Sequence, residues 1–233
     1  GTVTISDVDS GEAGTQAVNG TTAHGSYTID GAGHWSFTLN NSNAQVQALG
    51  VGDSLQDSFT VQSVDGTASK VITVAINGTN DLASITGQSK GTAVEDSGVD
   101  ATGTLNVSDK DNGEAHTKTA SGSAAYGSWA VDGDGHWSYH LNDSNAAVNA
   151  LAPGETLTDS FTVKSLDGSA SKVVTVTING ADDAPDAQAG SFAVDEDNHL
   201  SGNVTATDPD HGDSLTYGLA SGGQAANGTV TVH

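Results

Sequence analysis

The sequence lacks cysteine, arginine and methionine, and each absence excludes something. Without cysteine the chain has no disulfide, no thiolate zinc site and no cysteine nucleophile. Six lysines face 29 acidic residues, and the net charge of −23 argues against nucleic acid or an anionic membrane surface as a partner. No apolar run reaches the ~20 residues that span a bilayer, so we expect no membrane insertion of this segment. Because residue 1 is not methionine, we expect the chain to be a piece of a longer protein.

Apolar residues are also scarce, at 35% of the chain, while glycine is abundant at 30 residues. High charge with low hydrophobicity is typical of disordered chains. Here, however, apolar and polar residues alternate along the runs 35–39, 58–62 and 72–76, which is the pattern of half-buried strands with one solvated face. The composition and this period of two favour a turn-rich, all-β fold with a thin core.

An internal repeat sets the organisation. When the sequence is shifted by 102 residues, Gly33-His34-Trp35-Ser36 meets Gly135-His136-Trp137-Ser138, and more than half of the paired positions are identical. A period near 100 residues fits whole domains in series, each an antiparallel β-sandwich of about seven strands. The predicted domains are a first repeat at 1–81 that lacks its N-terminal part, a second repeat at 82–183 and a partial third repeat at 184–233.

Two local features recur in both full copies. The segments 30–33 and 132–135 lie between alternating runs and are predicted as hairpin turns rather than as metal-binding loops. The segments 42–49 and 144–151 are predicted as helices of one or two turns, with Val46 and Leu49 facing the core.

The acidic residues are concentrated rather than scattered. One group follows an Asp-x-Asp-x-Gly-acid pattern: Asp7, Asp9 and Glu12; Asp109, Asp111 and Glu114; Asp208, Asp210 and Asp213. Further groups lie at or just after the repeat boundaries: Asn80 and Asp81; Glu95 and Asp96; Asp182, Asp183 and Asp186; Asp195, Glu196 and Asp197. Like charges this close destabilise a fold unless cations intervene, and Ca²⁺ prefers six to eight oxygen ligands. The alternative is that the acids only keep the surface soluble.

The segments 25–39, 57–61 and 74–81, with their copies, resemble the VCBS repeat of large bacterial surface proteins. The fragment from Ala184 is similar to the related bacterial cadherin-like repeats. This resemblance implies the stalk of a type I-secreted adhesin of the repeats-in-toxin class, located at the bacterial cell surface and serving cell attachment and biofilm formation.

The likeness to cadherins implies roles for individual acids in Ca²⁺ binding between successive domains. Glu95 with Asp96 resembles the early acid, Asn80-Asp81 and Asp182-Asp183 resemble linkers, and Asp65 and Asp167 resemble the late aspartate. The full set of metal ligands implied is Asp7, Asp9, Asp65, Asn80, Asp81, Glu95, Asp96, Asp109, Asp111, Asp167, Asp182, Asp183, Glu196, Asp197, Asp208 and Asp210. The Asp-Arg-Glu motif of cadherins has no counterpart at 52–54 or 154–156, which implies fewer than three ions per junction.

The resulting hypothesis is mechanical: Ca²⁺ holds neighbouring repeats of the same chain rigidly, while other domains bind a host or abiotic surface. A module that itself binds a glycan or host protein is the alternative. Exposed aromatic residues would favour it, but Trp35, Trp129, Trp137 and Tyr139 lie at alternating strand positions that favour core packing. An enzyme is not expected, because a catalytic centre is normally built once and these acids recur in each repeat.

Overall fold

The computed structural model describes residues 1–221, 223, 225, 227 and 229–232. These form two compact units, each described by itself below. The first unit contains Gly1–Ile85, Asn106–Lys118 and Lys164–Ser171, and the second contains Thr86–Leu105, Thr119–Val163 and Lys172–His233. The first unit therefore combines the first repeat with two loop segments of the second repeat. Residues 222, 224, 226, 228 and 233 of the predicted third repeat lie outside the described residues.

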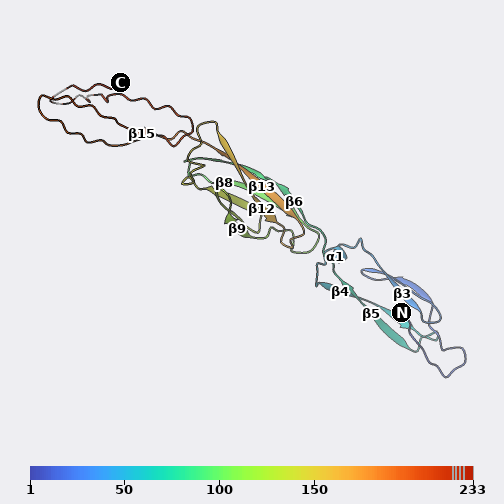
Figure 1. Ribbon diagram of the computed structural model, residues 1–233. Coiled ribbons are helices and arrows are strands. Elements are labelled where there is room, and N and C mark those ends of the chain that lie inside the picture. Colours follow the sequence, from blue (N-terminus) through green and yellow to red (C-terminus); the bar gives the residue numbers. More distant parts are fainter. Residues whose placement is uncertain (222, 224, 226, 228, 233) are drawn as a thin grey trace. The chain divides into compact units, whose positions relative to one another are not determined.

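The first repeat forms two small antiparallel sheets (Figure 1). One sheet has the order β1-β2-β3, from Val18–Thr21, Gly25–Ile29 and Trp35–Leu39, and the other pairs β4, Ser54–Gln62, with β5, Ser69–Asn77. Phe59 of β4 joins the two sheets, because its ring stacks on Tyr27 at 4.3 Å and meets Trp35 edge-on at 5.5 Å. Residues 30–33 connect β2 to β3 as the predicted hairpin turn.

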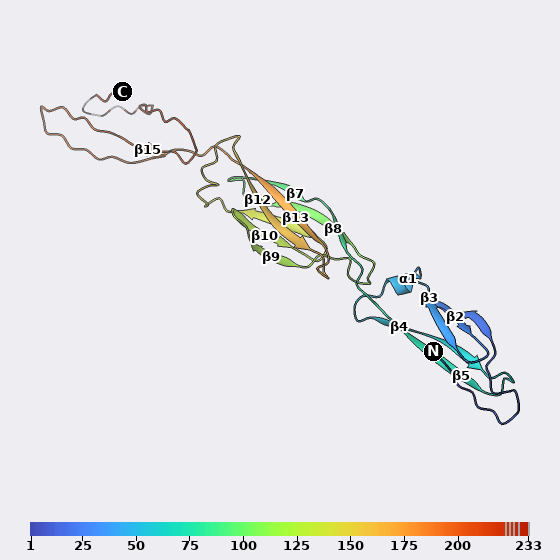
Figure 2. The ribbon, with the colours of Figure 1, turned by 45° about the vertical axis from the view of Figure 1, so that its right-hand side comes forward.

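The second repeat is a more complete sandwich (Figure 2). Its strands are β6 Ser84–Gly87, β7 Lys90–Val94, β8 Ala101–Ser108, β9 Ala120–Ser123, β10 Gly127–Val131, β11 His136–Leu141, β12 Thr156–Lys164 and β13 Ser171–Asn179. They form sheets of order β6-β8-β11-β10-β9 and β12-β13-β7, in which β7 and β13 are parallel. Phe161 stacks on Trp129 at 4.8 Å and meets Trp137 edge-on at 5.8 Å, so the same aromatic arrangement joins the sheets in both repeats.

The two predicted short helices have different outcomes. Helix α1, Ala44–Gln47, forms where expected, capped by the Asn43 side chain, with Val46 and Leu49 buried. The prediction of a helix at 144–151 is wrong, because that segment is a series of turns. A helix of a single turn is only marginally stable, because forming the first turn fixes several residues for very few hydrogen bonds. Asn149 replaces Gln47 there, and asparagine is a weaker helix former than glutamine.

The described part of the predicted third repeat contains two short antiparallel strands, β14 Asp186–Ala187 and β15 Ala206–Thr207. Over the described residues as a whole, we find no helix of the length and apolar character that crossing a membrane requires. The predicted all-β fold built from antiparallel sheets is confirmed, with β7–β13 as a parallel pair within it.

Candidate metal centres

Acidic side chains gather in three places, which we call clusters 1, 2 and 3. Clusters 1 and 2 lie in the first unit and cluster 3 in the second. Cluster 1 is Asp7, Glu12 and Asp65. Cluster 2 is Asp81, Asp109, Asp111, Glu114 and Asp167. Cluster 3 is Glu95, Asp96, Asp182, Asp183, Asp208, Asp210 and Asp213. In each cluster, three of the acids bring one carboxylate oxygen apiece within 4.8 Å of one another.

The same local structure shapes the Asp-x-Asp loop in all three clusters. The side chain of the first aspartate accepts a hydrogen bond from the N–H of the second, at 2.9 Å for Asp7–Asp9, 2.9 Å for Asp109–Asp111 and 3.1 Å for Asp208–Asp210. Aspartate favours this turn, in which its side chain bonds the backbone two residues on. A glycine at positive φ follows in each loop, with φ values of 92°, 81° and 85° at Gly11, Gly113 and Gly212.

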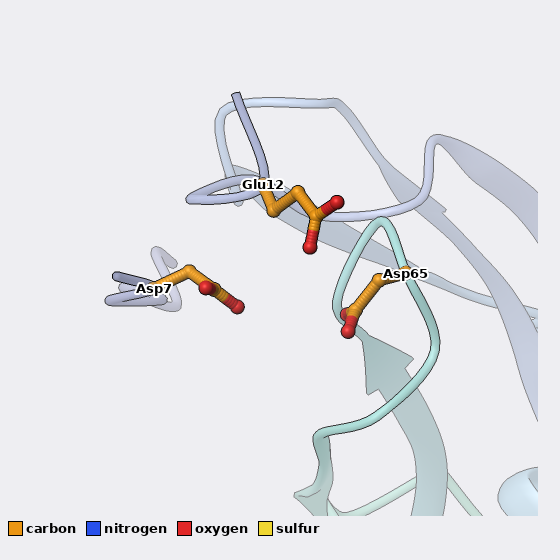
Figure 3. A group of neighbouring side chains, drawn as sticks. All are labelled: Asp7, Glu12 and Asp65. Carbon is orange, nitrogen blue, oxygen red and sulfur yellow. The ribbon is translucent and has the colours of Figure 1, made fainter. Parts of the chain in front are cut away.

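Cluster 1 is the most open of the three. Figure 3 shows Asp7, Glu12 and Asp65 approaching from separate segments, with their carboxylates turned toward a common space. Asp65 is exposed, and hydrogen bonds from Ser63 and Thr67 lower the pKa of its carboxyl group. Asp7 and Glu12 are half-buried.

Cluster 2 is closed on one side by the segment between the two repeats. Asp111 is only 2% exposed, and one of its oxygens accepts the backbone N–H of Asp81 at 2.8 Å. The Asn80 side chain donates to Asp167 at 3.3 Å, and the Lys110 ammonium lies 3.5 Å from Asp81. Asp109, Glu114 and Asp167 supply the three converging oxygens.

The charges of cluster 2 repel one another. Desolvation, followed by repulsion from Asp111, Asp167, Asp109 and Asp53, raises the pKa of Glu114. Asp167 behaves in the opposite way: desolvation acts to raise its pKa, but hydrogen bonds from Ser165, Ser169 and Asn80 outweigh it and lower the pKa to about 2. One carboxylate is thus fixed in its charged form beside another whose charge is disfavoured.

Cluster 3 repeats the backbone arrangement of cluster 2. The N–H of Asp183 donates to Asp210 at 2.8 Å, as that of Asp81 does to Asp111, and Asp210 is 5% exposed. Glu95 is 2% exposed, and one of its oxygens accepts the N–H of Ala181 at 3.3 Å. Cluster 3 therefore adds a deeply buried glutamate from the start of the second repeat.

In cluster 3, burial and repulsion together disfavour the charged carboxylates. Desolvation is the largest cause that raises the pKa values of Glu95, Asp183 and Asp213. Neighbouring carboxylates add to it, with Asp210 acting on all three. The charged forms of these groups are therefore disfavoured unless something positive lies among them.

Clusters 2 and 3 share a further property: they hold buried carboxylate oxygens with no hydrogen-bond donor. Among the described residues, one such oxygen occurs on each of Asp109, Asp111, Glu114, Asp167, Glu95, Asp183 and Asp210. Leaving a buried charged acceptor without a partner costs about 1–3 kcal/mol or more. Cluster 1 has no such oxygen in the described structure. The oxygen-only donor set of clusters 2 and 3 fits a hard divalent cation such as Ca²⁺, which carboxylates and carbonyls coordinate.

The structure brings together most of the acids singled out in the sequence. Two departures concern Glu196 and Asp197, which are exposed and belong to none of the three clusters as described. Asp9 is exposed and contributes its N–H to the loop, and Asn80 acts through its hydrogen bond to Asp167. The assignment of these residues as metal ligands stays a prediction.

Three acids that end the acidic pattern in each copy were not predicted as ligands: Glu12, Glu114 and Asp213. In the structure each of them contributes an oxygen to a converging group. The signal was available, because a glycine at positive φ turns the chain back and brings the following acid toward the first aspartate. Asp53 was also not predicted to belong to this site, although repulsion from its charge helps to raise the pKa of Glu114.

The two predicted hairpin turns form, and their aspartates bond the turn backbone. Asp132 accepts the N–H groups of Asp134 and His136 and pairs with the His136 ring at 3.0 Å. Asp30 makes the same contacts with Ala32 and His34. These carboxylates therefore hold turns.

Comparison with known proteins identifies two kinds of domain. Residues 80–180 match the bacterial cadherin-like domain, and residues 182–233 match a bacterial Ig domain. No curated protein matches the chain.

Among solved structures, protocadherin gammaB7 EC3-6, determined as a cis-dimer, is 20% identical with a TM-score of 0.46, covering 91% of this chain and 52% of that one. Mouse clustered PcdhgC3 EC1-3 is 17% identical with a TM-score of 0.40, covering 80% and 63%. The human desmocollin-1 ectodomain is 13% identical with a TM-score of 0.32, covering 81% and 37%. The chain thus spans less than two thirds of the length of each of these proteins.

Bacterial cadherin-like and Ig domains are typical of extracellular, adhesin-type repeat segments, and they are generally structural or adhesive modules rather than enzymes. Cadherin-like domains generally bind Ca²⁺. The chain is thus similar to the bacterial cadherin-like domain over residues 80–180 and to a bacterial Ig domain over residues 182–233.

Proposed function

We propose that this chain is a calcium-stabilised extender segment of a bacterial surface adhesin, and that Ca²⁺ binds clusters 2 and 3. The seven buried carboxylate oxygens without a donor carry this proposal. A solubilising coat of acids needs exposed charges, whereas Glu95, Asp111 and Asp210 are at most 5% exposed. Burying unpaired carboxylates is costly, and a cation compensates for it.

In cluster 2 the ligands would be Asp109, Asp111, Glu114 and Asp167, with Asp81 and Asn80 nearby. In cluster 3 they would be Glu95, Asp183, Asp210 and Asp213, with Asp96, Asp182 and Asp208 nearby. When bound, the ion supplies positive charge and oxygen coordination. The chain's own part is to hold the carboxylates in place, through the N–H groups of Asp81, Asp111, Ala181 and Asp183.

Both clusters combine acids from distant parts of the sequence. Cluster 2 joins the boundary residue Asp81 to loops at 109–114 and 167, and cluster 3 joins Glu95 to the boundary residues 182–183 and the loop at 208–213. An ion shared by these segments would cross-link each repeat boundary to the loops beside it. We propose that this fixes the boundary and keeps the segment extended, as a stalk for cell attachment and biofilm formation requires.

The alternative of a ligand-binding module has less support. An aromatic platform for a glycan needs exposed rings, but Trp137 is 2% exposed and Tyr139 is fully buried. Trp129 is half-buried, and its ring stacks on the buried ring of Phe161. The sequence resemblance alone supports the assignment to VCBS repeats, to adhesins of the repeats-in-toxin class and to the cell surface. It is also the only support for host or abiotic surfaces as partners of other domains.

Calorimetric titration of the full chain with Ca²⁺ after chelator treatment tests this proposal. We expect saturable binding that Asp111→Asn reduces in cluster 2 and Glu95→Gln reduces in cluster 3. Asp134→Asn is the matched control, because it removes the same charge from an exposed hairpin turn where the first repeat has Ala32. Absence of binding, or equal loss in all three variants, would contradict the assignment. Small-angle scattering then tests the stalk: the maximum dimension should fall when chelator is added.

A further inference from the structure

We propose that Asn112–Gly113 is a self-modification site, at which Asn112 converts through a cyclic imide to aspartate and isoaspartate. The reaction itself does not depend on the proposed function; only its consequence for cluster 2 does. The observation behind it is a difference among chemically identical pairs. The sequence contains Asn-Gly at 19–20, 77–78, 112–113, 179–180 and 227–228. Residue 228 lies outside the described residues, which leaves four pairs to compare.

The pair at 112–113 forms the exposed centre of a four-residue turn. The turn is closed by the N–H of Glu114 donating to the carbonyl of Asp111 at 3.2 Å. Gly113 has a φ of 81°, and no atom lies within 4 Å of the position where a Cβ would be. Within the described structure, neither the Gly113 N–H nor the Asn112 side chain makes a hydrogen bond. The attacking and the attacked groups are therefore both free.

The other three pairs are held by the fold. The N–H of Gly78 donates to Asp53 at 2.9 Å, and that of Gly180 donates to Glu155 at 3.1 Å. Both asparagines of these pairs end a nine-residue strand, β5 or β13. The pair at 19–20 lies inside β1, in register with Thr28 and Tyr27 of β2.

The chemistry needs only the chain and water. The backbone nitrogen of Gly113 attacks the side-chain carbonyl carbon of Asn112, and a new C–N bond closes the imide ring. The side-chain nitrogen leaves as ammonia, carrying the proton that the glycine nitrogen loses. Water then opens the imide at either carbonyl, which yields aspartate or isoaspartate. Glycine favours the attack because it has no Cβ to crowd the approach and leaves the backbone free to rotate.

The fold controls the relative rates. A pair whose glycine N–H is bonded must first open locally before it reacts. Each ~1.4 kcal/mol of opening free energy slows the reaction about tenfold. We therefore expect Asn112 to react at least about tenfold faster than Asn19, Asn77 and Asn179.

The modification would alter cluster 2. Either product adds a negative charge next to Asp111, which already lies among repelling carboxylates. Isoaspartate also lengthens the main chain of the turn by one carbon. The hydrogen bond from the Glu114 N–H to the Asp111 carbonyl would then be lost or displaced. Glu114 would then lose its place within 4.8 Å of Asp109 and Asp167. The equivalent loops have Ser10-Gly11 and His211-Gly212, so this change is particular to cluster 2.

The test is a time course on the full chain in mildly alkaline, calcium-free buffer. Cleavage after lysine places Asn112 in peptide 111–118, Asn77 in 71–90 and Asn19 in 1–70. Asn179 shares peptide 173–233 with Asn227, so fragment masses of that peptide distinguish these two residues. We expect the mass gain of an amide-to-acid conversion in peptide 111–118 first, with a second isomer resolved by chromatography. Equal rates at Asn112 and Asn77, or no reaction at Asn112, would overturn the proposal.

Two variants separate this chemistry from the metal site. Asn112→Ser introduces the residue type found at the equivalent position of the first repeat, Ser10. This variant should not form the imide at residue 112 and should still bind Ca²⁺. Asn112→Asp reproduces the added charge without the longer backbone, and should bind Ca²⁺ better than the aged, isoaspartate-containing protein. If Asn112 reacts but aged protein binds Ca²⁺ like fresh protein, the effect on cluster 2 is refuted. If fresh protein and Asn112→Ser both fail to bind Ca²⁺, the proposed function fails and the modification still stands.

Discussion

Replacing Glu95 by glutamine should stabilise the fold without calcium and reduce the stability that calcium adds. Glu95 is 2% exposed, one oxygen accepts the N–H of Ala181 at 3.3 Å, and the other has no donor. Desolvation, followed by repulsion from Asp183, Asp96 and Asp210, raises its pKa against the lowering effect of the Ala181 bond. Glutamine keeps the acceptor for Ala181, removes the charge and offers an N–H₂ group to the nearby carboxylates.

The size of each effect follows from these contacts. Without calcium, relieving a buried charged oxygen that has no partner should stabilise the fold by about 1–3 kcal/mol. Loss of one carboxylate ligand should weaken calcium binding about 10- to 100-fold, the size of loss known for supporting residues of metal sites. Because binding to the native state stabilises it by RT ln(1 + [L]/Kd), the stabilisation that calcium adds should fall by about 1.4–2.8 kcal/mol. The variant should therefore be more stable than the unmodified chain in chelator, and should gain less stability when calcium is added.

The assay is urea denaturation of the full chain followed by circular dichroism, in excess calcium and in chelator. Asp134→Asn is the control, and as a surface substitution it should change stability by less than about 0.5 kcal/mol in both conditions. If Glu95→Gln destabilises the chain equally in both conditions, Glu95 is only a hydrogen-bonding core residue. If it changes nothing in either, the buried-charge argument is wrong.

The remaining predictions concern pH, a buried hydrogen bond and a turn. In chelator, the melting temperature should rise as the pH falls from 7 toward the ordinary glutamate pKa of 4.5, because Glu95, Glu114 and Asp183 have raised pKa values and the folded state takes up the proton first. Below pH 4.5 the melting temperature should fall, because Asp159 and Asp167 have lowered pKa values in the folded chain and are protonated first in the unfolded chain. A continuous fall of the melting temperature from pH 7 would contradict the raised pKa values of Glu95, Glu114 and Asp183. Tyr139→Phe should cost about 1.5–3 kcal/mol in denaturant unfolding, because the buried hydroxyl donates to the Asp159 carboxylate at 2.7 Å, and a cost near zero would refute that bond. Gly135→Ala should destabilise far more than Gly168→Ala. Both glycines have φ near 80°, but only at Gly135 would an added Cβ collide with a backbone oxygen, that of Leu105. Equal melting temperatures would exclude this steric cause.

Much of the fold could be predicted because the repeat and the period of two act locally. The alternation at 35–39 and 58–62 places the aromatic residues on the inner face, and the structure stacks Tyr27 on Phe59 and Trp129 on Phe161 there. The parallel pairing of β7 with β13 was not predictable in this way. It joins residues more than 80 positions apart, and no short-range pattern specifies such a pairing.

The clusters could be predicted only in part. Asp109 and Asp167 lie 102 residues after Asp7 and Asp65. Because the two repeats have the same fold, each pair of aspartates meets in its own cluster. Which acids become buried depends instead on the path of the chain between repeats. The N–H of Asp81 covers Asp111, whereas Asp9, the corresponding residue in cluster 1, stays exposed. Glu114 was missed as a ligand although Gly113, directly before it, is the residue type that turns the chain back at positive φ.

The most direct test of the account is a thermal melt of the full chain in excess calcium and in chelator, beside the variant Asp109→Ala, Asp111→Ala. At a thousandfold excess over Kd, one bound ion adds ~4 kcal/mol. For a chain of this size that corresponds to a rise of about 10 °C in melting temperature. The account predicts a rise of at least this size in the unmodified chain and a clearly smaller rise in the variant, which keeps only cluster 3 intact. Identical melting temperatures with and without calcium would contradict it.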